Sequence, residues 1–164
     1  PTQGFFGANA NLEDETRRDG VEVSLTREFE KVRVNGTYSF TDAEIRGGPF
    51  DGNDFPGVPE HQASMTTVFY PMKQLSVALN GVYVGERPFI SDFENAFDDQ
   101  DDYFVANAKI RYAWDKMSAY LNVNNLLDEE YEEYGAISLF SSPMERAYYP
   151  SPEINFLLGF SVEL

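Results

Sequence analysis

The stretch INFLLGFSVEL, residues 154–164, decides the fold. Side chains of an extended strand point alternately to the two faces of a sheet, so residues two apart share a face. One face of this stretch is apolar and holds Ile154, Phe156, Leu158, Phe160, Val162 and Leu164. The other face is polar apart from Leu157 and holds Asn155, Gly159, Ser161 and Glu163. The pattern predicts a strand with one apolar face and one polar face.

The same alternation recurs along the whole chain. Residues 103–114 repeat it, with Phe104 and Trp114 on one face and Lys109 and Arg111 on the other. Further examples occupy residues 4–12, 21–26, 32–41, 60–70, 75–83 and 118–124. Together with residues 154–164 they predict about eight antiparallel strands and an all-β protein.

The connections between these strands alternate in length. Short turns are expected near Glu30–Lys31, Met72–Gln74 and Asp115–Lys116. Long polar connections are expected at 46–59, 91–102 and 131–152, and a brief one near 13–16. Short turns at one end and long loops at the other are typical of an up-and-down transmembrane β-barrel in a bacterial outer membrane, whose loops face outside.

The composition excludes several functional classes. With 28 acidic and 12 basic residues, the chain carries a formal charge of −16, which would repel a phosphate backbone, so we expect no nucleic-acid partner. There is no cysteine to supply a disulfide or a thiol nucleophile. No apolar run approaches the roughly 18 residues of a membrane helix. His61 is the single histidine, so we predict neither a metal site there nor catalysis, and the protein is not expected to be an enzyme.

Alternation alone does not separate a membrane barrel from a soluble β-sandwich, whose apolar face would pack on a second sheet. The placement of aromatic residues favours the barrel. On the apolar face of 103–114, Phe104 lies at the loop end, and Tyr112 and Trp114 lie at the turn end. Phe29 and Phe69 also lie beside short turns. Aromatic residues at both ends of a strand are typical of the two interfaces of a bilayer.

The stretch YLNVNNLLDEEY, residues 120–131, resembles a late signature of the TonB-dependent outer-membrane receptors. Further matches to this family occur in the same order at 19–22, 38–43, 56–61 and 83–87. The resemblance implies a barrel of about 22 strands. Residues 1–164 would form about its last eight strands, and the N-terminal plug domain would be absent from this chain. Since no signal peptide opens the chain at Pro1, we expect a fragment of a longer protein.

The resemblance also implies a function. Such receptors lie in the outer membrane, among lipid and lipopolysaccharide, and import a scarce small-molecule chelate, most often a ferric siderophore. TonB, with ExbB and ExbD, supplies the energy through the plug and its TonB box. Two alternatives remain open at this point. One is a passive porin-like channel or a small self-contained barrel, and the other is a soluble adhesive or carbohydrate-binding β-sandwich.

Candidate ligand-binding residues lie in or beside the long connections, where arginines and aromatic rings meet an anionic or aromatic chelate. They are Arg87, Phe89, Tyr131, Tyr134, Arg146, Tyr148 and Tyr149. A weaker candidate is a structural Ca²⁺ site, because the loop 91–102 is rich in carboxylates, although a solvated surface loop is the favoured explanation of them. Its candidate ligands are Asp98, Asp99, Asp101 and Asp102. No other cofactor is expected. Lys109 and Arg111 are expected to pair with neighbouring carboxylates.

Overall fold

The computed structural model describes residues 15–138 and 143–163. The strand predicted at 4–12 lies outside these residues. Within them the chain forms nine strands and one short 3₁₀ turn, η1 (Gly48–Phe50). The strands are β1 (Glu15–Glu28), β2 (Val32–Arg46), β3 (His61–Met72), β4 (Leu75–Val84), β5 (Tyr103–Trp114), β6 (Met117–Asn124), β7 (Glu132–Ser138), β8 (Glu145–Pro150) and β9 (Asn155–Val162).

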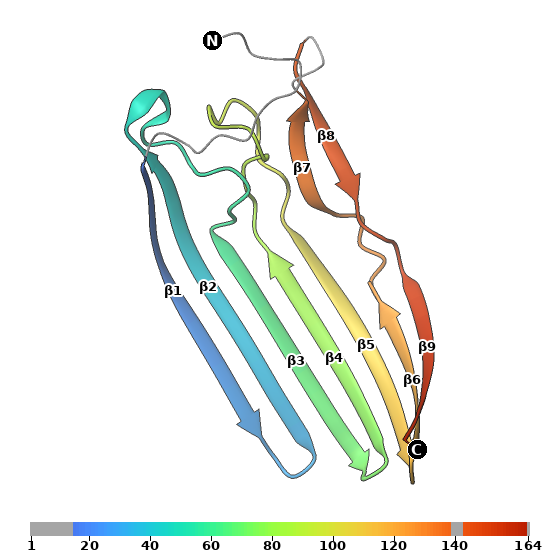
Figure 1. Ribbon diagram of the computed structural model, residues 1–164. Coiled ribbons are helices and arrows are strands. Elements are labelled where there is room, and N and C mark those ends of the chain that lie inside the picture. The colour runs from blue at the N-terminus through green and yellow to red at the C-terminus, as the bar shows by residue number, and fades with distance from the viewer. Residues whose placement is uncertain (1–14, 139–142, 164) are drawn as a thin grey trace.

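Seven strands form one antiparallel sheet in the order β1-β2-β3-β4-β5-β6-β9, and β7 and β8 form a separate hairpin (Figure 1). Each strand of the sheet pairs with the next along the chain, except that β6 pairs with β9, so the hairpin interrupts the connection between them. The three predicted short turns are confirmed and lie together at one end of the sheet (Figure 1). The long connections lie at the other end, as an up-and-down barrel wall requires.

Two predicted connections differ from the structure. The brief connection expected near 13–16 does not include Glu15 and Thr16, which belong to β1 and pair with Arg46 and Ile45, and residues 13–14 lie outside the described residues. The connection predicted at 131–152 is not a simple loop, because it contains the β7–β8 hairpin. In both places the partner strand supplies the backbone hydrogen bonds, so the strands continue through polar sequence that lacks a membrane-type alternation.

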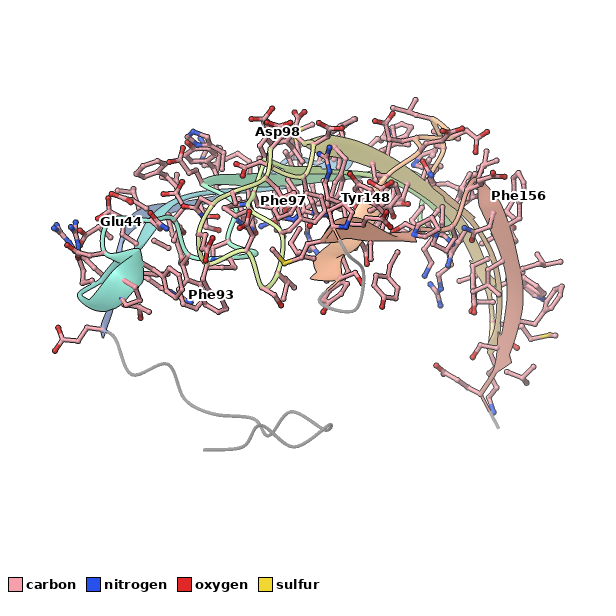
Figure 2. The ribbon with its side chains drawn as sticks, turned by 90° about the horizontal axis from the view of Figure 1, so that it is seen from above. Glu44, Phe93, Phe97, Asp98, Tyr148 and Phe156 are labelled. Atoms are coloured by element: carbon pink, nitrogen blue, oxygen red, sulfur yellow. The ribbon has the colours of Figure 1, made fainter. Side chains whose placement is uncertain are left out.

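The sheet is a single curved layer whose apolar face is uncovered. Seen along the strands it forms an arc, with Phe156 on the convex side (Figure 2). Phe156 and Phe160 are 66% and 71% exposed, and no second layer covers them in the part of the chain that the structure describes. This arrangement contradicts the β-sandwich alternative, because a soluble β-sandwich would bury these side chains against its second sheet. Among the described residues, no helix has the length and apolar content needed to cross a bilayer.

The concave face is polar and hydrogen-bonded across the strands. The strand register places Thr26, Asn35, Thr66, Asn80 and Asn107 in one row. The Asn35 amide donates to Thr26 Oγ1 at 2.8 Å, Asn80 to Thr66 Oγ1 at 3.0 Å, and Asn107 to Asn80 Oδ1 at 3.3 Å. Amide and hydroxyl side chains of this kind suit a water-filled or protein-filled interior, and they would be costly against lipid.

Candidate functional site

The described residues of the long connections 47–60, 85–102 and 125–154, here called the cap, lie at the end of the sheet opposite the short turns and contact one another (Figure 1). The buried hydrophobic side chains of the described chain all lie in the cap or on strand residues near it: Ala43, Ile45, Phe89, Val105 and Ile137. Connection 47–60 is tied to connection 85–102, because the Asn53 amide donates to Phe93 O at 2.8 Å and Asp54 N donates to Asn95 Oδ1 at 2.7 Å. The cap therefore has the packed interior that the sheet below it lacks.

Arg87 lies inside the cap. It is only 5% exposed, and its Nη2 donates a hydrogen bond to Glu132 O at 2.8 Å. The guanidinium also lies over the Tyr103 ring, 5.4 Å from its centroid. Since these contacts join the connection 85–102 to the start of β7, Arg87 positions the hairpin and presents little surface to a ligand in this arrangement.

Phe89 joins the same two segments. It is fully buried, and the edge of its ring meets Tyr148 with centroids 5.4 Å apart. A Cβ atom at Gly135 would lie 2.7 Å from both Phe89 and Gln100, so only glycine fits there. Ile90 extends the contact as a parallel bridge to Ala136. Of the predicted ligand residues, Phe89 thus serves the packing of the hairpin.

Tyr134 and Tyr149, here called the hairpin pair, lie on the opposite face of the hairpin from Gly135 and Tyr148. Both are exposed, and their rings meet edge to face with centroids 5.1 Å apart. Figure 2 shows the β7–β8 hairpin on the concave side of the arc. Arg146 is exposed where β8 begins. The predicted ligand residues that remain accessible are therefore concentrated on this hairpin.

The signature residues 120–131 build the turn that carries the hairpin. Asn125 is 2% exposed and has a positive φ of 50°. Its side chain donates to Glu129 O at 2.8 Å and accepts from Glu129 N at 2.9 Å. Asp128, also at positive φ, accepts from Ile154 N at 2.9 Å, and Tyr131 packs on Tyr103 with centroids 4.6 Å apart. No structural role was predicted for Asn125 or Asp128, although Asn and Asp are the residues that best tolerate this conformation.

Carboxylates gather around a hollow of about 410 Å³ where the cap meets β2, β3 and β4. The acidic lining residues are Asp54, Glu60, Glu86, Asp99 and Asp102. Burial and the neighbouring carboxylates, first among them Asp54, raise the pKa of Asp99. The buried Asp92 is otherwise engaged, because its carboxylate accepts from Ala96 N and Phe97 N at 3.0 and 3.1 Å.

The carboxylates of this loop are not arranged as a cation site. Among residues 15–138 and 143–163, no three His, Asp or Glu side chains are placed to hold a metal ion. The Ca²⁺ site suggested at Asp98, Asp99, Asp101 and Asp102 therefore gains no support from geometry and stays a prediction.

Lys109 and Arg111 lie on the polar face, as expected, but not in ion pairs. Lys109 Nζ lies over the Tyr120 ring, 4.7 Å from its centroid. Within the described chain, no carboxylate oxygen lies within 4.0 Å of either cation, so the predicted pairing is wrong there. The neighbouring positions across the strands, Ala78 and Asn122 for Lys109 and Ser76 and Tyr120 for Arg111, are uncharged.

Comparisons with known proteins agree on one family. The model described as "TonB dependent receptor-like, beta-barrel" matches residues 1–126. A relative named "Probable TonB-dependent siderophore receptor PiuA", from Acinetobacter baumannii, is 29% identical over 132 residues, which is 71% of this chain and 17% of that protein.

Solved structures share the fold. The siderophore receptor PiuA of Acinetobacter baumannii superposes with a TM-score of 0.76 at 24% identity, over 91% of this chain and 22% of that chain. The ferric-catecholate import receptor Fiu of E. coli K12 superposes with a TM-score of 0.71 at 25% identity, over 98% of this chain and 22% of that chain. The chain thus spans about a fifth of the length of the proteins it matches.

Proposed function

Since the chain belongs to the TonB-dependent receptor family and forms part of its β-barrel, we propose that the protein it contributes to imports a ferric siderophore across a bacterial outer membrane. The observation that carries the proposal is the single curved sheet, with an uncovered apolar convex face and a polar concave face. Relatives with this arrangement are named siderophore receptors.

In this proposal the convex face contacts lipid and lipopolysaccharide, and the concave face borders the transport path. TonB, acting with ExbB and ExbD, supplies energy through an N-terminal plug domain inside the barrel. The receptor changes no covalent bond of its ligand, in keeping with a family of transport receptors rather than enzymes.

The hairpin pair supplies a ligand contact at the mouth of the barrel. Tyr134 and Tyr149 are exposed on a hairpin that lies on the concave side of the arc, and their edge-to-face packing leaves ring surface free. Aromatic rings of a catecholate-type chelate would stack there, and the Arg146 guanidinium would attract its negative charge.

Iron uptake in a strain that lacks the gene for the full-length protein tests the proposal. The strain should lose growth on at least one ferric siderophore as the single iron source, and the gene should restore it. Restored uptake should disappear when TonB is deleted. Uptake that persists without TonB would instead identify a passive channel, and wild-type growth of the deletion strain on every siderophore tried would reject iron transport.

A further inference from the structure

One row of side chains on the convex face of the sheet contains two polar residues. The strand register gives the row from β1 to β9 as Arg27, Val34, Thr67, Leu79, Ala108, Val123 and Phe156. Phe156 lies on the convex side of the arc (Figure 2), and residues directly opposite one another in a sheet share a face. Arg27 and Thr67 therefore project from the convex face, with only Val34 between them.

Arg27 is the one charged residue on the apolar part of this face. Between the short turns and the pair Asp19 and Asp42 at the loop end, the described strands carry no other charge there. Arg27 is exposed, and within residues 15–138 and 143–163 its guanidinium forms no hydrogen bond, ion pair or ring contact. An unpaired charge against hydrocarbon is costly, so this side chain needs water or an anion within its reach.

Arg27 lies nearer the turn end of the sheet than Thr67 does. Arg27 is two residues before Phe29, whose N–H closes the β1–β2 turn on Val32 O. Thr67 is five residues before Met72, the last residue of β3. Since the short turns lie together (Figure 1), Thr67 lies deeper, and two strand spacings, roughly 10 Å, separate the two backbones. A phospholipid presents its polar groups in the same order, because its phosphate lies at the edge of the bilayer and its ester carbonyls lie below the phosphate.

The charges around Arg27 favour a lipid with a net negative charge. Arg33 and Glu28 form an ion pair at 2.7 Å, which leaves Arg27, Lys31 and Glu30 in the stretch 27–33. Two positive charges and one negative charge give a net charge of +1. A phosphatidylglycerol headgroup, with one negative charge, balances this stretch. A phosphatidylethanolamine headgroup is neutral overall, because its own ammonium group balances its phosphate.

We propose that Arg27 and Thr67 bind an anionic phospholipid of the leaflet at the turn end of the barrel. Its phosphate accepts from the Arg27 guanidinium, whose planar fork matches two phosphate oxygens. An ester carbonyl of the same lipid accepts from the Thr67 hydroxyl, which forms no hydrogen bond within the part of the chain that the structure describes. The inference rests on the proposed function, because it needs the convex face to contact lipid.

Native mass spectrometry of the full-length receptor in detergent, titrated with phosphatidylglycerol, tests the proposal. We expect Arg27→Gln to raise the dissociation constant of the tightest lipid site about tenfold, and Thr67→Val to raise it about threefold. Lys116→Gln removes the same charge from the β5–β6 turn and should match wild type. Phosphatidylethanolamine with the same acyl chains should bind to wild type about fivefold more weakly.

Equal affinities of wild type and Arg27→Gln would overturn the proposal and show that water hydrates Arg27 at the edge of the bilayer. Equal binding of the two lipids by wild type would also overturn it. If Arg27→Gln does not form a heat-resistant barrel on gels, Arg27→Lys replaces it. That variant keeps the charge but loses the planar fork, so its dissociation constant should rise in the same direction by a smaller factor.

Urea unfolding in vesicles separates a lipid from a protein partner. If a carboxylate on the neighbouring strand of the full barrel binds Arg27, Arg27→Gln lowers the unfolding midpoint equally in phosphatidylcholine vesicles with and without phosphatidylglycerol. That result would overturn the proposal, which requires a larger loss in the vesicles that contain phosphatidylglycerol. Neither lipid assay needs a siderophore, so a failed proposed function would show separately, as absent TonB-dependent uptake by wild type.

Discussion

The wall, which consists of β1–β6 and β9, and the cap above it differ in where their large apolar side chains lie. In the cap, Phe89 and Arg87 are enclosed by protein, and each makes specific contacts with the β7–β8 hairpin or its start. In the wall, side chains such as Phe156 and Phe160 are exposed to whatever surrounds the sheet. Transfer of one such side chain from water to hydrocarbon contributes about 1.5–3 kcal/mol. Under the proposed function, exposure of the convex side chains of the wall marks the surface that contacts lipid and not weak packing.

The largest expected effect concerns two adjacent residues of β9 that lie on opposite faces of the wall. Leu157 and Leu158 are 51% and 64% exposed, but they lie on the concave and convex faces respectively. Leu158→Arg in the full-length receptor should lower the free energy of unfolding in lipid by about 2–4 kcal/mol, because the charge would enter hydrocarbon. Leu157→Arg should cost much less, since its face borders the interior. Urea titration in vesicles measures both, and equal losses would contradict the assignment of faces.

The next effect concerns the close packing around Gly135 in the cap. Gly135→Ala would place a methyl group 2.7 Å from Phe89 and Gln100, and such overpacking typically costs about 1–3 kcal/mol. Gly36→Ala is the matched change in the wall, where the nearest atom would be Ser64 O at 3.8 Å. We expect faster protease cleavage between residues 85 and 154 for Gly135→Ala alone. Similar cleavage of the two variants would show that the cap does not depend on this close packing.

A smaller effect concerns ligand affinity. Replacement of Tyr134 or Tyr149 by Ala should weaken binding of a transported siderophore by roughly threefold to tenfold. An aromatic pair contact contributes about 0.5–1.5 kcal/mol, which corresponds to this change in affinity. Tyr70→Ala, on β3 near the turn end, removes an exposed tyrosine of the wall and should leave affinity unchanged. Titration of tryptophan fluorescence gives the Kd. An affinity unchanged by both hairpin variants would exclude the hairpin pair as a ligand contact.

The smallest effect is a pH dependence of the cap. Because the folded pKa of Asp99 is raised above its ordinary 3.8, the protonated carboxyl is favoured in the fold, and this contribution to stability is lost as the pH rises through the folded pKa. Asp99→Asn should therefore slow hydrogen exchange of residues 85–102 at pH 7. The corresponding rise in the free energy of local opening is about 0.5 kcal/mol or less, because solvent screens the charges. The gain should vanish below pH 3.8.

Asp115→Asn, in the β5–β6 turn at the opposite end of the sheet, makes the same change of charge and should leave exchange of residues 85–102 unaltered. A gain from Asp99→Asn that persisted below pH 3.8 would contradict the electrostatic origin of the effect.

The wall could be predicted from sequence because an extended strand with one apolar and one polar face has a sequence period of two. Phe156, Leu158 and Phe160 must share a face, whatever the partner strand, so alternation located the strands and short turns. The cap follows no such period. Arg87 is buried because Glu132 O lies beside it, and that neighbour is distant in sequence. The hairpin was not predicted because its strands are short, with Gly135 inside β7 and Pro150 at the end of β8. The pairing predicted for Lys109 and Arg111 was wrong because the residues opposite them are known only from the strand register.

The direct pairing of β6 with β9 makes the hairpin an insert whose removal need not disturb the strands on either side. Residues 132–150 are therefore a natural cassette for exchange among related receptors. Under the proposed function, replacement of this cassette would change recognition at the mouth of the barrel, while Asn125 and Asp128 hold its ends and the register of the sheet stays the same.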